Sequence, residues 1–600
     1  MRGMAGILSW RNRPQIDRLG ALGPLGEMSV FTARQGLIWQ AATAGYGFPA
    51  YSRADGDFCV FHGELPVDGG SLPTLSPDFP FWSETGNAEA GGTPGNPLNG
   101  GWVVAFWDQA SEQLTLARDP VGIRAVYWAI HDGMAYFATD LSLFRWMKYP
   151  LAVDSRGLAH FLRFRYVPEP WTIFRDVKSL HPGGGIRIGR ETREVLDYGK
   201  ALFSAGGSQR GVAPQEVDGY LEHMEAGLVR STRERVRGGK AGLWLSGGKD
   251  SGALAIAVSR NPDLDVHCFT VGFDNSVSDE SSRATALARH LGLRHEVVRV
   301  ANSDCAGAFV RWIGALGQPF GDLALIPYAV AFEAVRSRVD LFLDGTGSDL
   351  YFGIPPSRSQ QIAGQILKWG GSRGARIMRS CFRKRDFAKL LDRRWEALFI
   401  SWNSWRDEEI EAIMGLRPDF SECAWYRLLA DLRHRSLLEI ETNLVGLVWE
   451  PSTVYRKGIQ IADRANAMIA FPWADRRLAR FARGLPKSLM YQGQVNKILV
   501  RKYLAQHLPP ELANLPKRYF VAPRSAILDP DRNPWVLEYL DPSRIRAEGL
   551  LDPVITDAYV QRWRSGDSAL EDRILALLIW EVWHASFSAS AGSTRRALAG

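Results

Sequence analysis

The sequence predicts a strand-rich α+β domain with an antiparallel sandwich over residues 1–203, a Gly- and Ser-rich linker over 204–215, and an α/β domain over 216–600 whose last part is helical. The first observation is a series of short alternating apolar runs separated by turn residues, typical of antiparallel strands; they lie at 102–107, 113–117, 125–130 and 134–138. The second is a set of apolar runs that alternate with helical stretches, which indicates a parallel sheet with crossover helices; they lie at 241–245, 266–271, 295–300 and 340–343. Beyond residue 362 the sequence favours helices.

Length and composition exclude several classes of protein. With 600 residues the chain exceeds a usual single core, and 46% hydrophobic with 23% charged residues is ordinary globular composition. A net charge of +7 over so large a surface falls short of the concentrated basic character of a nucleic-acid domain. Five cysteines without a C-x-x-C pair indicate neither a disulfide framework nor a zinc site, and no apolar run resembles a signal core or a membrane span. We therefore expect a soluble, cytoplasmic protein with no nucleic-acid or membrane partner.

A glycine-rich hexapeptide stands between the apolar run at 241–245 and a helix-like run at 251–259; it reads Ser246-Gly247-Gly248-Lys249-Asp250-Ser251. Backbone amides at such a strand-to-helix turn converge on phosphate oxygens. The glycines let the backbone approach the anion, the serines add hydroxyl donors, and Asp250 is a candidate Mg²⁺ ligand. The spacing is not that of a Walker A loop. The hexapeptide predicts an ATP-using protein.

A second strand also runs into a glycine-rich turn that ends in a carboxylate, Gly345-Thr346-Gly347-Ser348-Asp349. Ligands of parallel α/β sheets bind beyond the carboxyl ends of the strands, so we expect both loops at one edge of the sheet. Asp250 and Asp349 are then predicted to flank one Mg²⁺-pyrophosphate, the leaving group of an adenylating enzyme.

Further segments extend this pattern along nearly the whole chain. They are Ala117 to Tyr127, Tyr166 to Gly183, Phe269 to Phe273 with Asp279-Glu280, Phe471 to Asp475, Asn496-Lys497 and Leu515 to Phe520. Together with the two glycine-rich loops, they resemble the asparagine synthetase superfamily. The resemblance implies an N-terminal class II glutamine amidotransferase-like domain, an Ntn-hydrolase-like antiparallel sandwich. It also implies an α/β PP-loop ATP pyrophosphatase (adenine nucleotide alpha hydrolase-like) synthetase domain.

The resemblance implies a reaction with ATP and Mg²⁺ as cofactors. A substrate carboxylate attacks the α-phosphate of ATP, pyrophosphate leaves, and an amine attacks the acyl-adenylate to form an amide. Asp250 and Asp349 would carry Mg²⁺, and Lys517 is the candidate electrostatic catalyst because a flexible cation stabilises charge on phosphorus and on the acyl centre. The implied cofactor-binding set is Ser246, Gly247, Gly248, Asp250, Ser251, Val271 and Gly345.

The departures from the superfamily concern the source of the amine. Glutamine-hydrolysing members have a Cys after the initiator Met, whose α-amine serves as base for the thiolate; here Ala5 stands at that place, so we expect no glutaminase activity. The oxyanion Asn is replaced by His62, which we interpret as structural rather than catalytic. Thr346 replaces a Glu or Tyr and Leu350 replaces a Glu, so proton transfer from the amine must be arranged differently.

An adenylation site without a glutaminase favours a substrate that carries its own amine. The preferred hypothesis is a lasso peptide cyclase, which joins the N-terminal amine of a ribosomal precursor peptide to an Asp or Glu side chain, with a leader peptidase as partner. The basic, aromatic stretch from Arg373 to Arg394 suits a peptide partner or, equally, a solvated helix face. Two alternatives stay open: a β-lactam synthetase or ammonia-dependent asparagine synthetase, and a non-catalytic binding protein on a decayed synthetase.

Overall fold

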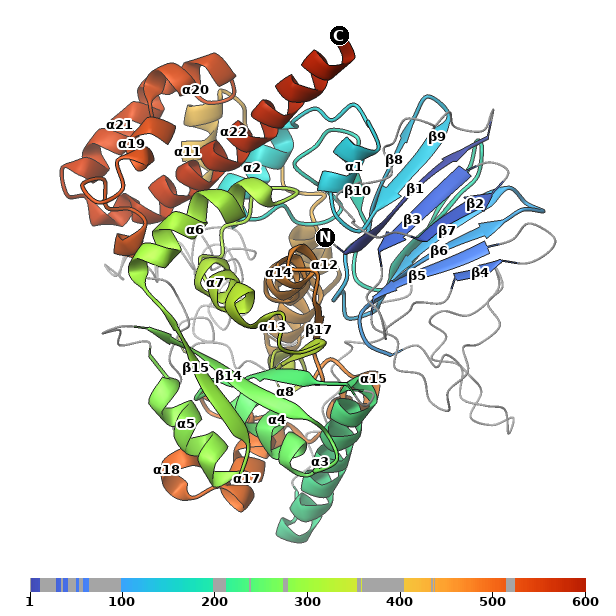
Figure 1. The fold of residues 1–600 in the computed structure, drawn as a ribbon, viewed down its shortest axis with the longest axis vertical. Coiled ribbons are helices and arrows are strands. Elements are labelled where there is room, and N and C mark those ends of the chain that lie inside the picture. Colours follow the sequence, from blue (N-terminus) through green and yellow to red (C-terminus); the bar gives the residue numbers. More distant parts are fainter. Residues whose placement is uncertain are drawn as a thin grey trace, which may run out of the picture.

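The computed structural model describes residues 2–10, 29–33, 36–41, 50–52, 58–63, 99–197, 212–236, 239–273, 279–352, 358, 404–432, 435, 437–513 and 524–599. In Figure 1 the antiparallel strands of the N-terminal part lie on the right, and the parallel strands with their helices lie below and to the left. The predicted order of an antiparallel sandwich, a parallel α/β domain and a helical C-terminal part is confirmed.

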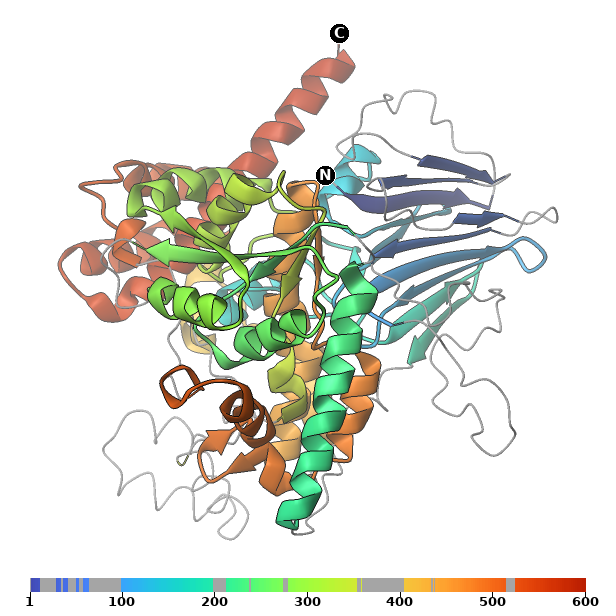
Figure 2. The same cartoon turned by 60° about the horizontal axis from the view of Figure 1, so that its bottom comes forward.

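Two six-stranded antiparallel sheets form the N-terminal sandwich, and Figure 2 shows them as stacked layers. The first has the order β10-β8-β9-β1-β3-β2 and the second the order β12-β11-β7-β6-β5-β4. Their bounds are β1 Gly3–Ser9, β2 Ser29–Ala33, β3 Gly36–Ala41, β4 Ala50–Ser52, β5 Phe58–Gly63, β6 Trp102–Asp108, β7 Gln113–Arg118, β8 Tyr127–His131, β9 Met134–Ala138, β10 Lys178–Ser179, β11 Gly184–Ile188 and β12 Arg193–Asp197. Two helices, α1 Ser142–Trp146 and α2 Ser155–Phe164, complete this part.

Strand β1 separates two hydrophobic clusters because successive side chains of a strand point to opposite faces. Met4 and Leu8 belong to the cluster between the two sheets. Ala5 and Ile7 belong to the large cluster that continues into the C-terminal half of the chain. The two domains therefore share one continuous hydrophobic core.

Five parallel strands in the order β15-β14-β13-β16-β17 form the sheet of the second domain. Their bounds are β13 Ala241–Trp244, β14 Val266–Phe273, β15 Arg294–Val300, β16 Leu341–Asp344 and β17 Met468–Ala470. The sequence predicted the first four. It missed β17, whose three residues are too few for periodicity to mark them; this strand pairs with β16. A two-stranded hairpin, β18 Tyr491–Gln492 and β19 Val495–Asn496, was also missed.

Helices surround the parallel sheet and extend beyond it. In Figure 1, α3, α4 and α5 lie below its strands and α6 and α7 above them. The first group is α3 Pro214–Val236, α4 Lys249–Ser259, α5 Ser281–His290, α6 Asn302–Ala315, α7 Leu325–Val335 and α8 Ser348–Phe352. The second is α11 Asp407–Met414, α12 Ala424–Leu432, α13 Leu437–Leu444, the π-helix η2 Val445–Tyr455, α14 Arg456–Arg464, α15 Arg476–Arg483, α16 Lys487–Met490, α17 Ile498–His507, α18 Pro510–Ala513, α19 Trp535–Tyr539, α20 Pro542–Glu548, α21 Pro553–Arg564 and α22 Glu571–Ala599, with short 3₁₀ turns η3 Arg524–Ala526 and η4 Ser568–Leu570.

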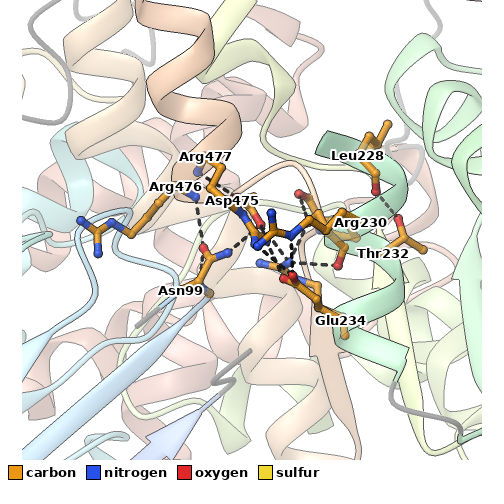
Figure 3. A network of polar contacts seen from close by, with 12 residues as sticks. Asn99, Leu228, Arg230, Thr232, Glu234, Asp475, Arg476 and Arg477 are labelled. Carbon is orange, nitrogen blue, oxygen red and sulfur yellow. Dashed lines mark hydrogen bonds and ion pairs between the residues drawn. The ribbon is translucent and has the colours of Figure 1, made fainter. Parts of the chain in front are cut away.

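Polar contacts fix the two domains to each other. Figure 3 shows Asn99, just before β6, turned toward Asp475 at the start of α15; its amide Nδ2 donates to Asp475 Oδ2 at 2.6 Å. Asp475 also accepts from Arg477 and is paired with Arg235. Burial acts against this carboxylate, but the arginines and Asn99 outweigh it and hold the pKa of Asp475 well below its usual range. Asp475 ends the Phe471 to Asp475 segment that the sequence singled out, which gives that segment a role in domain docking.

Several predictions concern residues outside those described. They include Lys517, the basic stretch from Arg373 to Arg394, and most of the linker at 204–215, of which the structure describes the last four residues. Within the described part of the chain, no helix combines the length and apolarity that crossing a membrane requires. The cysteines described, Cys59, Cys268, Cys305 and Cys423, are all buried and free.

Candidate active site

The loop between β13 and α4 is held in shape by its own two serines. The hydroxyl oxygens of Ser246 and Ser251 lie 2.8 Å apart, and the Gly248 N–H donates to Ser246 Oγ at 3.1 Å. Helix α4 begins at Lys249, two residues before the predicted start, because Gly248 is its extended N-cap with φ −83° and ψ 163°. Asp250 therefore lies in the first helical turn, where the positive end of the helix dipole stabilises a carboxylate.

The second loop, after β16, packs directly against the first. A Cβ atom on Gly345 would lie 2.8 Å from both the Cα and the N of Ser251. Atoms of the backbone do not move aside as a flexible side chain does, so only glycine fits there. The pairing of β13 with β16 puts Trp244 opposite Asp344 and brings both loops to one edge of the sheet.

We expect Gly345→Ala to weaken ATP binding and to destabilise the domain by about 1–3 kcal/mol, the usual range for overpacking. The Km for ATP and the midpoint of thermal unfolding measure the two effects. Gly219→Ala is the matched control, because Gly219 lies in α3 with no atom within 4 Å of the added Cβ. An ATP affinity equal to that of the control would show that the two loops do not need this close approach.

Lys497 joins the two predicted metal ligands. Its Nζ lies 2.6 Å from Asp250 Oδ2 and 2.9 Å from Asp349 Oδ1, so one ammonium contacts both carboxylates. Lys497 is only 4% exposed. Burial alone would lower its pKa, but Asp250 and Asp349 outweigh that effect and raise the pKa above the usual lysine value. The lysine is therefore a permanent buried cation at this site.

The backbone of Lys497 is constrained as well. It has φ 56° and ψ 42°, the left-handed conformation, and stands between β19 and the start of α17. A residue with a side chain adopts this conformation at a cost of about 1–3 kcal/mol and keeps it where its surroundings hold it. Such strained residues cluster at functional sites, and the two carboxylates supply the constraint here.

The Asp250 and Asp349 carboxylates fit a metal that arrives with its nucleotide. Within the described ranges, no group of three or more His, Cys, Asp or Glu side chains is arranged to hold a metal ion. Mg²⁺ in phosphate sites takes one or two carboxylates and completes its shell with phosphate oxygens and water. Two convergent carboxylates beside the predicted phosphate-binding loop meet that requirement, and their metal-binding role remains a prediction.

Thr346, which replaces a Glu or Tyr of the superfamily pattern, has a structural role. Its hydroxyl donates to Asp344 Oδ1 at 2.6 Å, and its N–H donates to the same oxygen at 2.9 Å. The Tyr328 hydroxyl donates to the other oxygen of Asp344 at 2.8 Å. Thr346 thus closes a tight turn and offers no base to a reacting amine.

Glu450 supplies a titratable group that the sequence did not reveal. It lies in η2, is 3% exposed, and lines the same cavity as the two loops. Burial, followed by the negative charge of Asp349, raises the pKa of Glu450 to about 8, although Lys497 and the Tyr455 hydroxyl act in the opposite direction. A carboxyl with a pKa close to the working pH is suited to accept a proton from an amine.

These groups surround one cavity of about 430 Å³, the size of a small-molecule site. Of the seven residues predicted to bind the cofactor, six line it: Ser246, Gly248, Asp250, Ser251, Val271 and Gly345. Gly247 instead lies against Arg283, with a notional Cβ 3.1 Å from the Cβ of that residue. Asp349 and Lys497 are also in the wall, and aromatic surface comes from Trp244, Tyr328 and Trp449.

In the described part of the first domain, a buried alanine stands at the place where the superfamily pattern has the glutaminase cysteine. Ala5 is fully buried in the middle of β1, opposite Trp39 of β3 and Ala138 of β9. His62 Nε2 lies 3.2 Å from a guanidinium nitrogen of Arg124. Burial and the charges of Arg124 and Arg2 lower the pKa of His62 well below its usual value, which agrees with a structural histidine.

Two segments of the chain match known protein families. Residues 223–585 match the asparagine synthase family, and residues 87–199 match the glutamine amidotransferase domain. The chain belongs to the asparagine synthase family. It is therefore an ATP-dependent carbon–nitrogen ligase of a family that uses ATP and Mg²⁺.

Relatives in this asparagine synthase family are distant. A putative glutamine-hydrolysing asparagine synthetase of Mycobacterium tuberculosis (strain H37Rv) is 25% identical over 525 residues, which cover 82% of this chain and 77% of the relative. Glutamine-hydrolysing asparagine synthetase 1 of Bacillus subtilis is 23% identical over 526 residues, 81% and 77% of the two chains. Amidase chry2 of Gibberella zeae is 25% identical over 281 residues, 43% of this chain and 40% of the amidase.

Proposed function

We propose that this enzyme closes a macrolactam ring in a ribosomal precursor peptide, as lasso peptide cyclases do, and releases AMP and pyrophosphate. The observation that carries the proposal is a contrast between the two domains. The synthetase cavity has its phosphate loops, two carboxylates, a buried cation and a buried base. The first domain has a buried alanine where glutamine-hydrolysing members have a cysteine. The amine must then come from elsewhere, and a peptide carries both amine and carboxylate.

The activation step uses charge and position. Backbone amides of the loop at the start of α4 would bind phosphate oxygens of ATP. Asp250 and Asp349 would hold the Mg²⁺, which neutralises charge on the departing pyrophosphate when bound. Lys497 stays protonated beside them, so it would stabilise negative charge that develops when the substrate carboxylate attacks the α-phosphate.

The amide-forming step needs a proton acceptor, and Glu450 is the candidate. The substrate amine must lose a proton as it attacks the acyl-adenylate carbonyl and AMP leaves. Thr346 is committed to Asp344, whereas Glu450 lines the cavity with a pKa of about 8. We assign Lys517 the role of a second cation at the reacting phosphate, as the superfamily pattern implies; its residue lies outside those described.

Ammonia-dependent asparagine synthesis is the second candidate. It is favoured by the names of the relatives, most of which are asparagine synthetases. Closure of a small ring, as in β-lactam synthetases, would use the same adenylation chemistry. A non-catalytic protein on a decayed synthetase is the least favoured alternative, because both predicted loops, the carboxylate pair and the cation meet at one cavity.

Mass spectrometry separates these candidates. The enzyme is incubated with ATP, Mg²⁺ and leaderless peptides that have a free N-terminal amine and an internal acid. Loss of one water from the peptide together with AMP formation is the expected result. AMP formation only with L-aspartate and ammonium would favour the second candidate, and no AMP with any of these substrates would support the non-catalytic alternative.

The genomic surroundings give an independent check. A cyclase is expected beside a short precursor-peptide gene and a gene for a leader peptidase, which we propose as its partner. If both are missing, the small-molecule alternatives gain support.

A further inference from the structure

The π-helix η2, which carries Glu450, also contacts the first domain. Pro451 interrupts it and has no N–H to donate to a helical bond. π-helical turns are rare and occur frequently at functional sites. Pro451 and Ser452, the two residues immediately after Glu450, contact the first domain. The backbone of η2 therefore links the position of Glu450 in the cavity to these interdomain contacts.

Ser452 is bonded across the domain interface. Its hydroxyl donates to Glu169 Oε2 at 2.9 Å, and Ser452 is completely buried. The other oxygen of Glu169 is 3.2 Å from Arg118 Nη1. Each oxygen of this buried carboxylate therefore has a defined partner. The hydrogen bond to Glu169 fixes the orientation of the Ser452 hydroxyl.

Arg118 is itself anchored in the first domain. Its guanidinium donates to the carbonyl oxygens of Leu180 at 2.6 Å and Gly122 at 2.8 Å, and also to that of Arg124. Arg118 and Glu169 lie in the two N-terminal segments, Ala117 to Tyr127 and Tyr166 to Gly183, that the sequence singled out. Neither Arg118 nor Glu169 lines the cavity of the candidate active site.

Two further contacts hold η2 on the same side. Gly122 has φ +75°, and a Cβ there would lie 2.9 Å from Pro451 Cβ, so the domains approach too closely for any side chain. Arg456, directly after η2, donates to the Tyr127 hydroxyl. Residues 451, 452 and 456 are thus all fixed by the first domain.

We propose that the first domain positions the base of the amide-forming step, with Glu169 acting on Glu450 through Ser452 and the backbone of η2. This inference rests on the proposed function, in which Glu450 accepts the proton of the amine. Ser452 and Glu169 are positioning residues, since neither lines the cavity. The first domain would then complete the synthetase site without needing a cysteine at position 5.

The test compares the two half-reactions in the full-length enzyme. Ser452→Ala and Glu169→Gln are expected to lower kcat for amide formation about tenfold or more, since small displacements of a catalytic group have effects of this order. In both variants, ATP/pyrophosphate exchange and the Km for ATP are expected to stay within about twofold of wild type, because the activation residues are untouched. Ser452→Thr is expected to restore the rate of amide formation, because threonine keeps the hydroxyl.

Ser404→Ala controls for the loss of a buried hydroxyl. Ser404 is also fully buried and donates to the Asp572 carbonyl at 2.9 Å. If Ser452→Ala forms amide as fast as Ser404→Ala does, or if it loses exchange and amide formation in parallel, the proposal is overturned.

Amide hydrogen exchange over residues 445–455 gives a readout that needs no substrate. Faster exchange in Ser452→Ala than in wild type and Ser404→Ala supports the positioning role; equal exchange overturns it. The hydrogen-exchange measurement decides the inference even if the wild-type enzyme forms no amide from the peptides or from aspartate. Such a lack of amide formation would reject only the proposed function.

Discussion

Asp250→Asn is expected to reduce ATP cleavage at least about a thousandfold, because it removes charge where the phosphates, the metal and Lys497 meet. It should also destabilise the protein. Lys497 is almost fully buried and would keep only Asp349 as an ionic partner, and breaking one partner from a buried pair costs about 3–5 kcal/mol. The one-quarter exposure of the Asp250 side chain places the expected cost at or below the lower end of that range. AMP release and thermal unfolding measure the two effects.

The double variant Asp250→Asn with Lys497→Met separates catalysis from stability. Removing both partners leaves no buried ammonium, and of the three charges only Asp349 remains, whose side chain is 23% exposed. Part of the lost stability should therefore return while activity stays lost. Recovery of ATP cleavage in the double variant would contradict the role that we assign to this carboxylate.

Glu450→Gln is expected to separate the two half-reactions. Glutamine keeps the shape of the side chain but cannot accept a proton, so amide formation should fall about 10²–10⁴-fold, whereas ATP/pyrophosphate exchange continues. Glu441→Gln is the matched control. Glu441 is a half-buried glutamate on α13 with a buried carboxyl oxygen. Burial raises its pKa to about 7, and it does not line the cavity. If Glu450→Gln and Glu441→Gln lose amide formation equally, Glu450 has no specific role in that step.

The pH dependence of the wild-type enzyme follows from the same group. With a pKa of about 8, Glu450 is mostly protonated at neutral pH, so the rate of amide formation should rise with pH through about 8. Stability should change in the opposite direction. The folded pKa lies above the ordinary value of 4.5, so the folded state holds the proton more tightly and loses stability as the pH rises from about 4.5 to 8. Glu450→Gln should lack both trends.

The two loops of the site were accessible from the sequence because each is a local motif at the end of a strand. Adjacent parallel strands end at one edge, so Ser246 to Ser251 and Gly345 to Asp349 had to lie near each other once the strands were identified. The helix start at Lys249 was missed because a glycine N-cap carries no side-chain signal. The departures at Ala5 and Thr346 were also visible, since they are single residues within recognisable segments.

Lys497 and Glu450 could not be placed in the same way. Lys497 is 247 residues beyond Asp250 and reaches it from the end of a short hairpin. Its segment resembles the superfamily pattern, yet nothing in the residues around it shows that its ammonium lies between two carboxylates. Glu450 stands before a proline, which argues against the helix that in fact contains it. Its position depends on packing between domains, and periodicity does not record such packing.

The burial of Ala5 has an evolutionary consequence. A change of Ala5 to cysteine would put a thiol in the centre of a sheet, next to a peptide nitrogen rather than a free α-amine. Exposing that amine would require removal of the residues ahead of it, including Arg2, whose N–H donates to the Asp463 carbonyl of the other domain at 2.8 Å. Gaining a free α-amine at this place would therefore remove a contact between the domains at the same step, so no single substitution would both supply the thiol and free the amine.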